Sequence, residues 1–484
     1  MKYPFFNYNK ILPFLICAFI LASCSTSEKK EKAKKTKKVE VNIDLNQILE
    51  RGYITAIMDN SSTGLFLYKG RPMGYEYELL SIFADSLGVE LRFEITPDME
   101  EAFEKLENGG GDILAFNLTV TKERRERIAF TDYHNITRQV LIQRKPDSWR
   151  KMKLHEIENS LIRTPIELIG KEINVRKSSA YVSRLQNLSD EIGGDILVVE
   201  DSADVETEKI IRKVARGEID YTVADEDIAL VNARYYPNID IKTPVSLPQQ
   251  IAWGVRKNSD SLRHSLNEWI RQMKLKSEYY TIYDKYFKST LRSKRRLKSE
   301  YFSATKERIS PYDSIIKIAA DSIGWNWRLL AAQISQESKF DPDAESWVGA
   351  IGLMQILPKN GEEYGASDLT DPQQNIRVGT KHIQWLQDVW RNEVPDSVER
   401  QKFILASYNV GQGHVQDAVR LTKKYNGDTT LWEDHVSKYL LLKSEPKYYK
   451  DEVVKFGYCR GREPVAYVEE ILKLHQQYVH LVDE

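Results

Sequence analysis

The residue of this 484-residue chain best suited to acid–base chemistry is Glu337. Leu330, Ile334 and Glu337 follow the i, i+4, i+7 spacing of one helix face, which places the carboxyl at the end of an apolar stripe. Burial against apolar neighbours raises a carboxyl pKa, because the charged form loses solvation. A glutamic acid protonated near neutral pH can act as a general acid, worth roughly 10²–10⁴ in rate. Taken alone, the helix favours the alternative that Glu337 is a structural carboxylate at a solvent-exposed helix end.

Two later sequence blocks favour a catalytic role of Glu337 over a structural one. Segment 349–355 reads Gly-Ala-Ile-Gly-Leu-Met-Gln, and its two glycines allow the backbone to approach a ligand closely. Gln355, at the end of the segment, can both donate and accept hydrogen bonds. Tyr408 and Asn409 add an aromatic face and an amide near the end of another predicted helix. The three blocks together predict a binding site around the Glu337 carboxyl.

These blocks resemble the motifs of lytic transglycosylases with a goose-lysozyme-like fold, which are Glu-Ser, Gly-Leu-Met-Gln, Ala-Tyr-Asn and a later Tyr. The resemblance covers about 311–477. The matching residues are Glu337, Ser338, Gly352, Leu353, Met354, Gln355, Tyr408, Asn409 and Tyr467. The chain departs from the pattern at Ser407, which stands in place of alanine as a small-for-small change.

The resemblance implies a carbon–oxygen lyase that cuts peptidoglycan strands between N-acetylmuramic acid and N-acetylglucosamine without consuming water. Glu337 would protonate the bridging oxygen and then, as a carboxylate, take the proton of the C6 hydroxyl, which closes a 1,6-anhydro ring. Asn409 would hold the sugar acetamide, and Tyr467 would hydrogen-bond Glu337. The other residues implied to bind the glycan are Ser338, Gly352, Met354, Gln355 and Tyr408.

Two other functions stay open. A hydrolytic, lysozyme-like muramidase would need a second acid to activate water. Asp341 and Glu345 lie near Glu337 in the sequence but outside the motifs. The other possibility is a non-catalytic lipoprotein that only grips peptidoglycan or a solute. The intact acid and the amides Gln355 and Asn409 argue against it.

The elements around these motifs predict two fold classes. Short apolar runs alternate with amphipathic segments over 41–290, which predicts a mainly parallel α/β sheet. The expected strands are 53–57, 89–95, 112–116, 173–175, 196–199 and 221–224, with helices at 77–87 and 99–108. Beyond a basic linker at 291–310 the strand signals vanish, so 311–484 is expected to be all-α. Its expected helices are 312–323, 327–335, 374–390, 399–408 and 465–478.

The segment 117–124, Asn-Leu-Thr-Val-Thr-Lys-Glu-Arg, resembles the signature of family 3 periplasmic solute-binding proteins of the amino-acid type. The resemblance implies a type II two-lobed α/β domain over 41–290, with lobe 1 at about 41–138 and 250–290 and lobe 2 at about 139–249. Arg124 would clamp a ligand carboxylate in the bidentate geometry that suits a guanidinium. Asn117 and Thr119 would assist, and Asp225 would pair with a ligand amine.

This second domain raises the hypothesis that an amino acid or muropeptide regulates the first site. Tyr133 and His134 follow Asp132 where the family has a proline, so the ligand preference stays open. The alternative for Arg124 is a surface residue in the charged run 122–127.

The first 24 residues predict a bacterial lipoprotein signal. Lys2 and Lys10 precede an apolar run at 11–22, which is too short for a comfortable membrane span. The run ends in Leu-Ala-Ser-Cys, which resembles a lipobox and implies lipidation of Cys24; an uncleaved anchor or a chance cysteine is the alternative. The lysine-rich stretch 25–40 predicts a solvated tether. Serine after Cys24 favours the periplasmic face of the outer membrane, by analogy with sorting in some bacteria.

Composition argues against other classes of function. The net charge is −1, from 70 basic and 71 acidic residues, which gives no push toward nucleic acid. The eight histidines show no metal-ligand spacing, and no phosphate loop is present, so neither a metal nor a cofactor is expected. Cys459 would be the only free thiol of the mature chain, which leaves no intramolecular disulfide.

Overall fold

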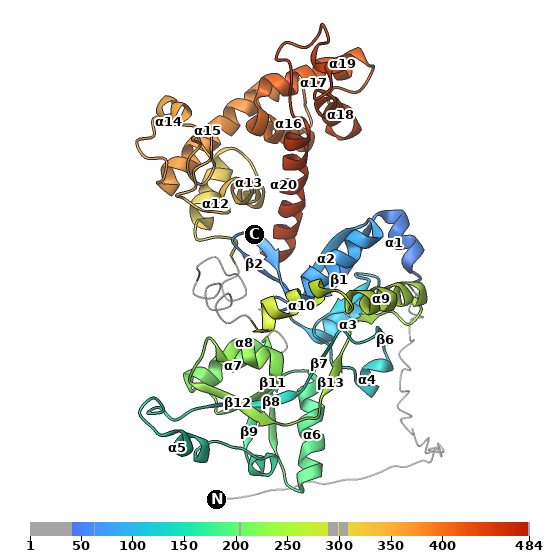
Figure 1. Ribbon diagram of the computed structural model, residues 1–484, viewed down its shortest axis with the longest axis vertical. Helices are drawn as coiled ribbons and strands as arrows, with labels where there is room; N and C mark the ends of the chain where they lie inside the picture. The colour runs from blue at the N-terminus through green and yellow to red at the C-terminus, as the bar shows by residue number, and fades with distance from the viewer. Residues whose placement is uncertain (1–40, 62, 203–204, 289–298, 300–307, 483–484) are drawn as a thin grey trace, which may run out of the picture. The chain divides into compact units, whose positions relative to one another are not determined.

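The computed structural model describes residues 41–484 except 62, 203–204, 289–298, 300–307 and 483–484. The predicted signal at 1–24, the tether at 25–40 and most of the linker at 291–310 lie outside the described residues. Val41–Glu484 form one compact unit. Figure 1 shows an α/β part followed by helices along the chain. No helix of the described residues is long and apolar enough to cross a membrane.

The first lobe contains a five-stranded sheet in the order β4-β1-β5-β14-β6. β1 pairs in parallel with β4 and β5, whereas β14 runs antiparallel to β5 and β6. The strands are β1 (Tyr53–Met58), β4 (Glu90–Ile95), β5 (Ile113–Ala115), β6 (Ala129–Phe130) and β14 (Gly254–Val255). The helices are α1 (Leu45–Arg51), α2 (Tyr75–Leu87), α3 (Met99–Glu107), α4 (Lys122–Arg125), α9 (Asp260–Met273) and α10 (Ser277–Tyr283). Because β14 comes late in the chain, the first lobe is completed only after the chain has built the second.

The second lobe has its own five-stranded sheet, in the order β10-β9-β11-β8-β12. Its strands are β8 (Gln139–Arg144), β9 (Glu172–Arg176), β10 (Leu197–Asp201), β11 (Tyr221–Asp225) and β12 (Ile239–Pro244). Its helices are α5 (Leu154–Asn159), α6 (Ala180–Ile192), α7 (Thr207–Arg216) and α8 (Glu226–Ala233). The chain passes between the lobes twice, through β7 (Asn135–Thr137) and β13 (Gln249–Ile251), which pair antiparallel.

The helical part begins at α12 (Asp313–Ser322), and its described residues contain no strand. Its long helices are α13 (Trp327–Ser338), α15 (Pro372–Trp390), α16 (Ser397–Val410), α17 (Gln412–Lys424) and α20 (Arg462–Leu481). The shorter ones are α14 (Pro358–Glu363), α18 (Ser437–Leu442) and α19 (Pro446–Tyr449). The predicted fold class, a two-lobed α/β domain followed by an all-α domain, is confirmed.

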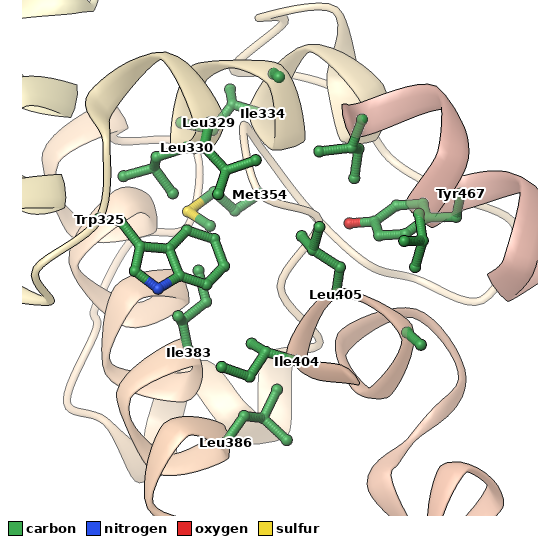
Figure 2. Close-up of a cluster of buried hydrophobic side chains, with 14 of the residues drawn as sticks. Trp325, Leu329, Leu330, Ile334, Met354, Ile383, Leu386, Ile404, Leu405 and Tyr467 are labelled. Carbon is green, nitrogen blue, oxygen red and sulfur yellow. The ribbon is translucent and has the colours of Figure 1, made fainter. Parts of the chain in front are cut away.

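The helical core fixes the helix that carries Glu337. α13 packs against α20 and α12, and Leu330 and Ile334 are fully buried. Figure 2 shows these two side chains in one cluster with Met354, Leu405 and Tyr467, which come from separate segments. The Asn326 side chain caps the start of α13 by accepting from the Arg328 amide. Burial of the stripe therefore holds the end of α13 in place.

Candidate active site and ligand-binding cleft

Glu337 lies in the last turn of α13 and meets Tyr467 from α20. The Tyr467 hydroxyl donates a hydrogen bond to Glu337 Oε1 at 2.5 Å. Burial raises the pKa of Glu337 from its ordinary 4.5 to about 7, and the hydrogen bond from Tyr467 opposes part of this rise. A carboxyl with this pKa is protonated in a large fraction of molecules at neutral pH, and it can both give and take a proton there.

No second carboxylate of the described residues contributes to the pKa shift of Glu337. Asp341 and Glu345, the acids nearest in sequence, are both exposed. Glu345 lies in a short bridge with Ile351 at the base of a surface turn. The site is therefore built around one half-buried acid.

The loop after α13 depends on a glycine at position 352. Gly352 has φ +80°, and a Cβ atom there would lie 2.3 Å from both Asn375 Nδ2 and the Leu369 carbonyl oxygen. Asn375 donates to the carbonyls of Ile351 at 2.9 Å and Leu369 at 2.8 Å. Its own carbonyl accepts from the Met354 amide at 2.8 Å. Asn375 is a loop-fixing residue that sequence reasoning missed, because it lies on α15 outside every motif.

Three residues predicted to bind the glycan hold this loop with their polar atoms. Ser338 Oγ donates to the Leu353 carbonyl at 2.8 Å, and the Tyr408 hydroxyl donates to the Met354 carbonyl at 2.8 Å. Gln355 Nε2 donates to the Ala344 carbonyl at 3.1 Å and the Gly352 carbonyl at 3.0 Å. The motif blocks thus meet at one loop beside Glu337.

Asn409 is exposed at the end of α16, one position after Tyr408, whose side chain holds the loop. Ser407, the departure from the motif, is buried and accepts a hydrogen bond from Trp390 Nε1 at 2.9 Å. Trp390 is fully buried, so its indole N–H needs a partner inside the protein. The serine is therefore the acceptor for this indole, and the change from alanine has a structural reason.

The four ligand residues predicted in the α/β domain line one cavity between the lobes. The Arg124 side chain donates to the Thr119 carbonyl at 3.1 Å, and burial lowers the pKa of its guanidinium. Asn117 Nδ2 donates to Asp225 Oδ2 at 3.1 Å, which joins the first lobe to β11 of the second. Burial chiefly, and then the charge of Asp227, raise the pKa of Asp225 to about 7.

Four further charged residues line the same cavity and were not predicted: Asp59, Arg176, Glu206 and Glu208. Arg176 ends β9, and its Nη1 donates to Asp59 Oδ2 at 3.3 Å. The second terminal nitrogen of Arg176 donates to the Pro97 carbonyl. Glu206 directly precedes α7. These residues stand alone at the end of a strand or at the start of a helix and belong to no motif, so the sequence did not indicate that they line the cavity.

Two family models match the chain in the order of its two domains. Residues 54–289 match the bacterial extracellular solute-binding proteins, family 3, and residues 314–431 match the transglycosylase SLT domain. A membrane-bound lytic murein transglycosylase F of Desulfosudis oleivorans is 35% identical over 426 residues, which are 88% of this chain and 90% of that protein. This chain belongs to the membrane-bound lytic murein transglycosylase F family. Both family resemblances predicted from the motifs are confirmed.

A second member of the membrane-bound lytic murein transglycosylase F family, from Photobacterium profundum, is 31% identical over 440 residues, with 90% of this chain and 82% of that protein covered. Among solved structures, an ancestral arginine-binding protein bound to arginine matches 49% of this chain and 99% of its own, at 22% identity and a TM-score of 0.41. In the described residues of this family member, no group of three or more His, Cys, Asp or Glu side chains is arranged to hold a metal ion.

Proposed function

We propose that this chain is a peptidoglycan lytic transglycosylase in which Glu337 serves first as acid and then as base. The observation that carries the proposal is the half-buried Glu337 carboxyl, which is bonded to Tyr467 and has its pKa raised to about 7. The relatives are named lytic murein transglycosylases, which supports the same activity. The chemistry therefore rests on one titrating group in the motif-bearing domain.

The reaction begins with Glu337 protonated. Its proton passes to the oxygen that bridges N-acetylmuramic acid and N-acetylglucosamine, and the bond from C1 of the muramic residue to that oxygen breaks. N-acetylglucosamine leaves as an alcohol, and the acetamide oxygen of the muramic residue forms a bond to C1. The Glu337 carboxylate next removes the C6 hydroxyl proton, and the C6 oxygen displaces the acetamide at C1. The 1,6-anhydro ring closes, Glu337 is protonated again, and no water is consumed.

Tyr467 supports both steps by holding one carboxyl oxygen of Glu337, which leaves the other for the sugar. Asn409, exposed at the end of α16, is proposed to hold the acetamide. Ser338, Gly352, Met354 and Gln355 are proposed to shape the glycan-binding surface, because their contacts set the loop next to Glu337.

A hydrolytic muramidase is the rival reaction, and it needs a second carboxylate to activate water, about 6.5–9.5 Å from the acid in an inverting enzyme. The exposure of Asp341 and Glu345 disfavours it. Digestion of purified peptidoglycan by the wild-type protein and by Glu337→Gln tests the proposal. We expect anhydro-muramic products from the wild type and none from the variant. Equal turnover by the two proteins would remove Glu337 from the mechanism.

The α/β domain is proposed to bind an amino acid or muropeptide and to regulate cleavage. A route exists through the hairpin of β2 (Phe66–Tyr68) and β3 (Arg71–Met73), since Leu67 belongs to the core cluster of the helical domain. The Tyr478 hydroxyl of α20 donates to the Gly70 carbonyl in the hairpin turn. Arg71 reaches Gln336 Oε1, one residue before Glu337, at 3.4 Å. An unchanged cleavage rate and glycan affinity at saturating ligand would rule out the regulation.

Lipidation of Cys24 is proposed to anchor the protein at the periplasmic face of the outer membrane. The lipobox-like sequence and the word membrane-bound in the relatives' name support the proposal. Replacing Cys24 with alanine should move the protein from the membrane fraction to the soluble fraction. If the Cys24→Ala protein were found in the outer-membrane fraction in the same amount as the wild type, the proposal would be contradicted.

A further inference from the structure

The cavity between the lobes contains a second set of opposite charges besides Arg124 and Asp225. Asp59 follows β1, Arg176 ends β9 and Glu206 precedes α7, and all three line the cavity. The cavity holds about 640 Å³ of space outside protein atoms, part of it open to solvent. Amino-acid recognition at one end requires only Arg124 and Asp225, so the second set is available for another part of the ligand.

Two buried atoms in this cavity lack a protein partner. Arg176 is 5% exposed and Asp225 is 2% exposed. Among the described residues, Arg176 Nε and Asp225 Oδ1 have no hydrogen-bond partner. A buried polar atom without a partner costs on the order of 1–3 kcal/mol, and native structures contain few of them. Because Arg176 and Asp225 both line the cavity, a ligand there could supply an acceptor to Arg176 Nε and a donor to Asp225 Oδ1.

The charges around Arg176 are also unbalanced. Asp59 is bonded to Arg176, while Glu206 lies close enough for the charge of Asp59 to disfavour its ionised form. Burial, with that charge as the next cause, raises the pKa of Glu206 to about 8. Besides Arg176, the charge of Lys209 favours the ionised form of Glu206 and the charge of Glu208 opposes it. An additional cation would favour ionisation of both Asp59 and Glu206. A ligand amine between Asp59 and Glu206 would be such a cation.

We propose that the cleft binds a diamino-dicarboxylic acid, with one amino-carboxylate end on Arg124 and Asp225 and the other on Arg176, Asp59 and Glu206. The proposal rests on the proposed amino-acid-binding function of the domain and adds the chemistry of the far end. The second amine pairs with Asp59 and Glu206, and the second carboxylate accepts from Arg176 Nε. A diamino acid with one carboxylate would leave Arg176 Nε unpaired, and an apolar amino acid would leave the whole second set unpaired.

Calorimetric titration of the full chain with meso-diaminopimelate, lysine and leucine tests the proposal. We expect diaminopimelate to bind about tenfold more tightly than lysine and about a hundredfold more tightly than leucine, since each step removes a charge-assisted hydrogen bond. Equal affinity for the three probes, or no binding of any of them by folded protein, would overturn it.

Variants separate the two ends of the cleft. Glu206→Gln should abolish the preference of lysine over leucine, because the second amine loses its carboxylate partner that is not bonded to Arg176, whereas Glu218→Gln, an exposed acid of the same lobe, should keep it. Arg124→Met should lose all three probes. If Arg124→Met binds normally, the domain function itself is wrong. If Arg124→Met loses binding and Glu206→Gln keeps the wild-type order of affinities, only the second amino-carboxylate site is wrong.

Discussion

Tyr467 donates a hydrogen bond to the carboxyl of Glu337, a residue 130 positions earlier in the chain. The bond joins the end of α13 to α20, and it opposes the effect of burial on the pKa of Glu337. Burial is therefore the main cause of the raised pKa of Glu337, and the hydrogen bond from Tyr467 lowers that pKa in part. This relationship leads to predictions for activity, pH dependence and stability.

Glu337→Gln should lower turnover by on the order of 10²–10⁴ or more, because the acid and the base are removed together. The same change should stabilise the fold at alkaline pH. The pKa of Glu337 is raised on folding, so the folded chain binds the proton more tightly than the unfolded chain. The contribution of Glu337 to stability consequently falls as pH rises from 4.5 through about 7.

Thermal melting of the wild type, Glu337→Gln and Glu345→Gln at pH 5 and pH 8 measures this effect. We expect Glu337→Gln to gain on the order of 1–3 kcal/mol relative to wild type at pH 8 and less at pH 5. Exposed Glu345 serves as the control and should change little. If the Glu337→Gln protein were less stable than wild type at pH 8, ionisation of Glu337 would not destabilise the fold, and the prediction would be wrong.

Tyr467→Phe removes the hydrogen bond that lowers the pKa of Glu337. The alkaline limb of the pH–rate profile, where the acid loses its proton, should move to higher pH, and the maximal rate should fall because the carboxyl is less well held. Steady-state turnover from pH 5 to pH 9 measures both effects. A limb that stays in place, or moves to lower pH, would mean that Tyr467 does not act on Glu337.

Ser407→Ala restores the alanine of the motif but leaves the buried Trp390 indole without its acceptor. We expect a loss of about 1–3 kcal/mol in the free energy of unfolding. Turnover per folded molecule should stay near that of wild type, because the Ser407 side chain is buried and bonded to Trp390 rather than exposed to substrate. Denaturant unfolding with a parallel activity assay checks both. Unchanged stability would show that Trp390 finds another partner.

Binding of an amine in the cleft should release protons at neutral pH. Asp225 and Glu206, with pKa values of about 7 and 8, are partly or mostly protonated there before the ligand arrives. A cation beside them favours their charged forms, so the affinity for diaminopimelate should rise from pH 6 to pH 9. Calorimetry in two buffers of different ionisation enthalpy counts the protons. Identical heats in both buffers would contradict the linkage.

The sequence predicted those parts of the site that lie within continuous motifs. Local residue patterns indicated Glu337 and Tyr408, and the family resemblance added Tyr467. The periodic helices predicted over 327–335 and 465–478 lie within a few residues of α13 and α20. Helix α17 was missed, because it begins directly after Gly411 ends α16 and no loop separates the two.

Contacts of residues that lie outside every motif were beyond sequence reasoning. Asn375 and Trp390 act on the motif loop and on Ser407 from α15, and neither has a local signature. Arg176 and Glu206 enter the ligand cavity from the second lobe, so their role depends on how two separate sheets face each other. Tertiary packing, rather than spacing, determines these partners.

The most direct test of the central claim is the fate of solvent oxygen during cleavage. Peptidoglycan would be digested by the full-length protein in water labelled with heavy oxygen, and the soluble muropeptides would be analysed by mass spectrometry. Glu337 acting alone as acid and base predicts 1,6-anhydro ends that contain no label. Reducing muramic ends that carry one labelled oxygen per cut would show that water attacks the sugar, and would contradict the mechanism.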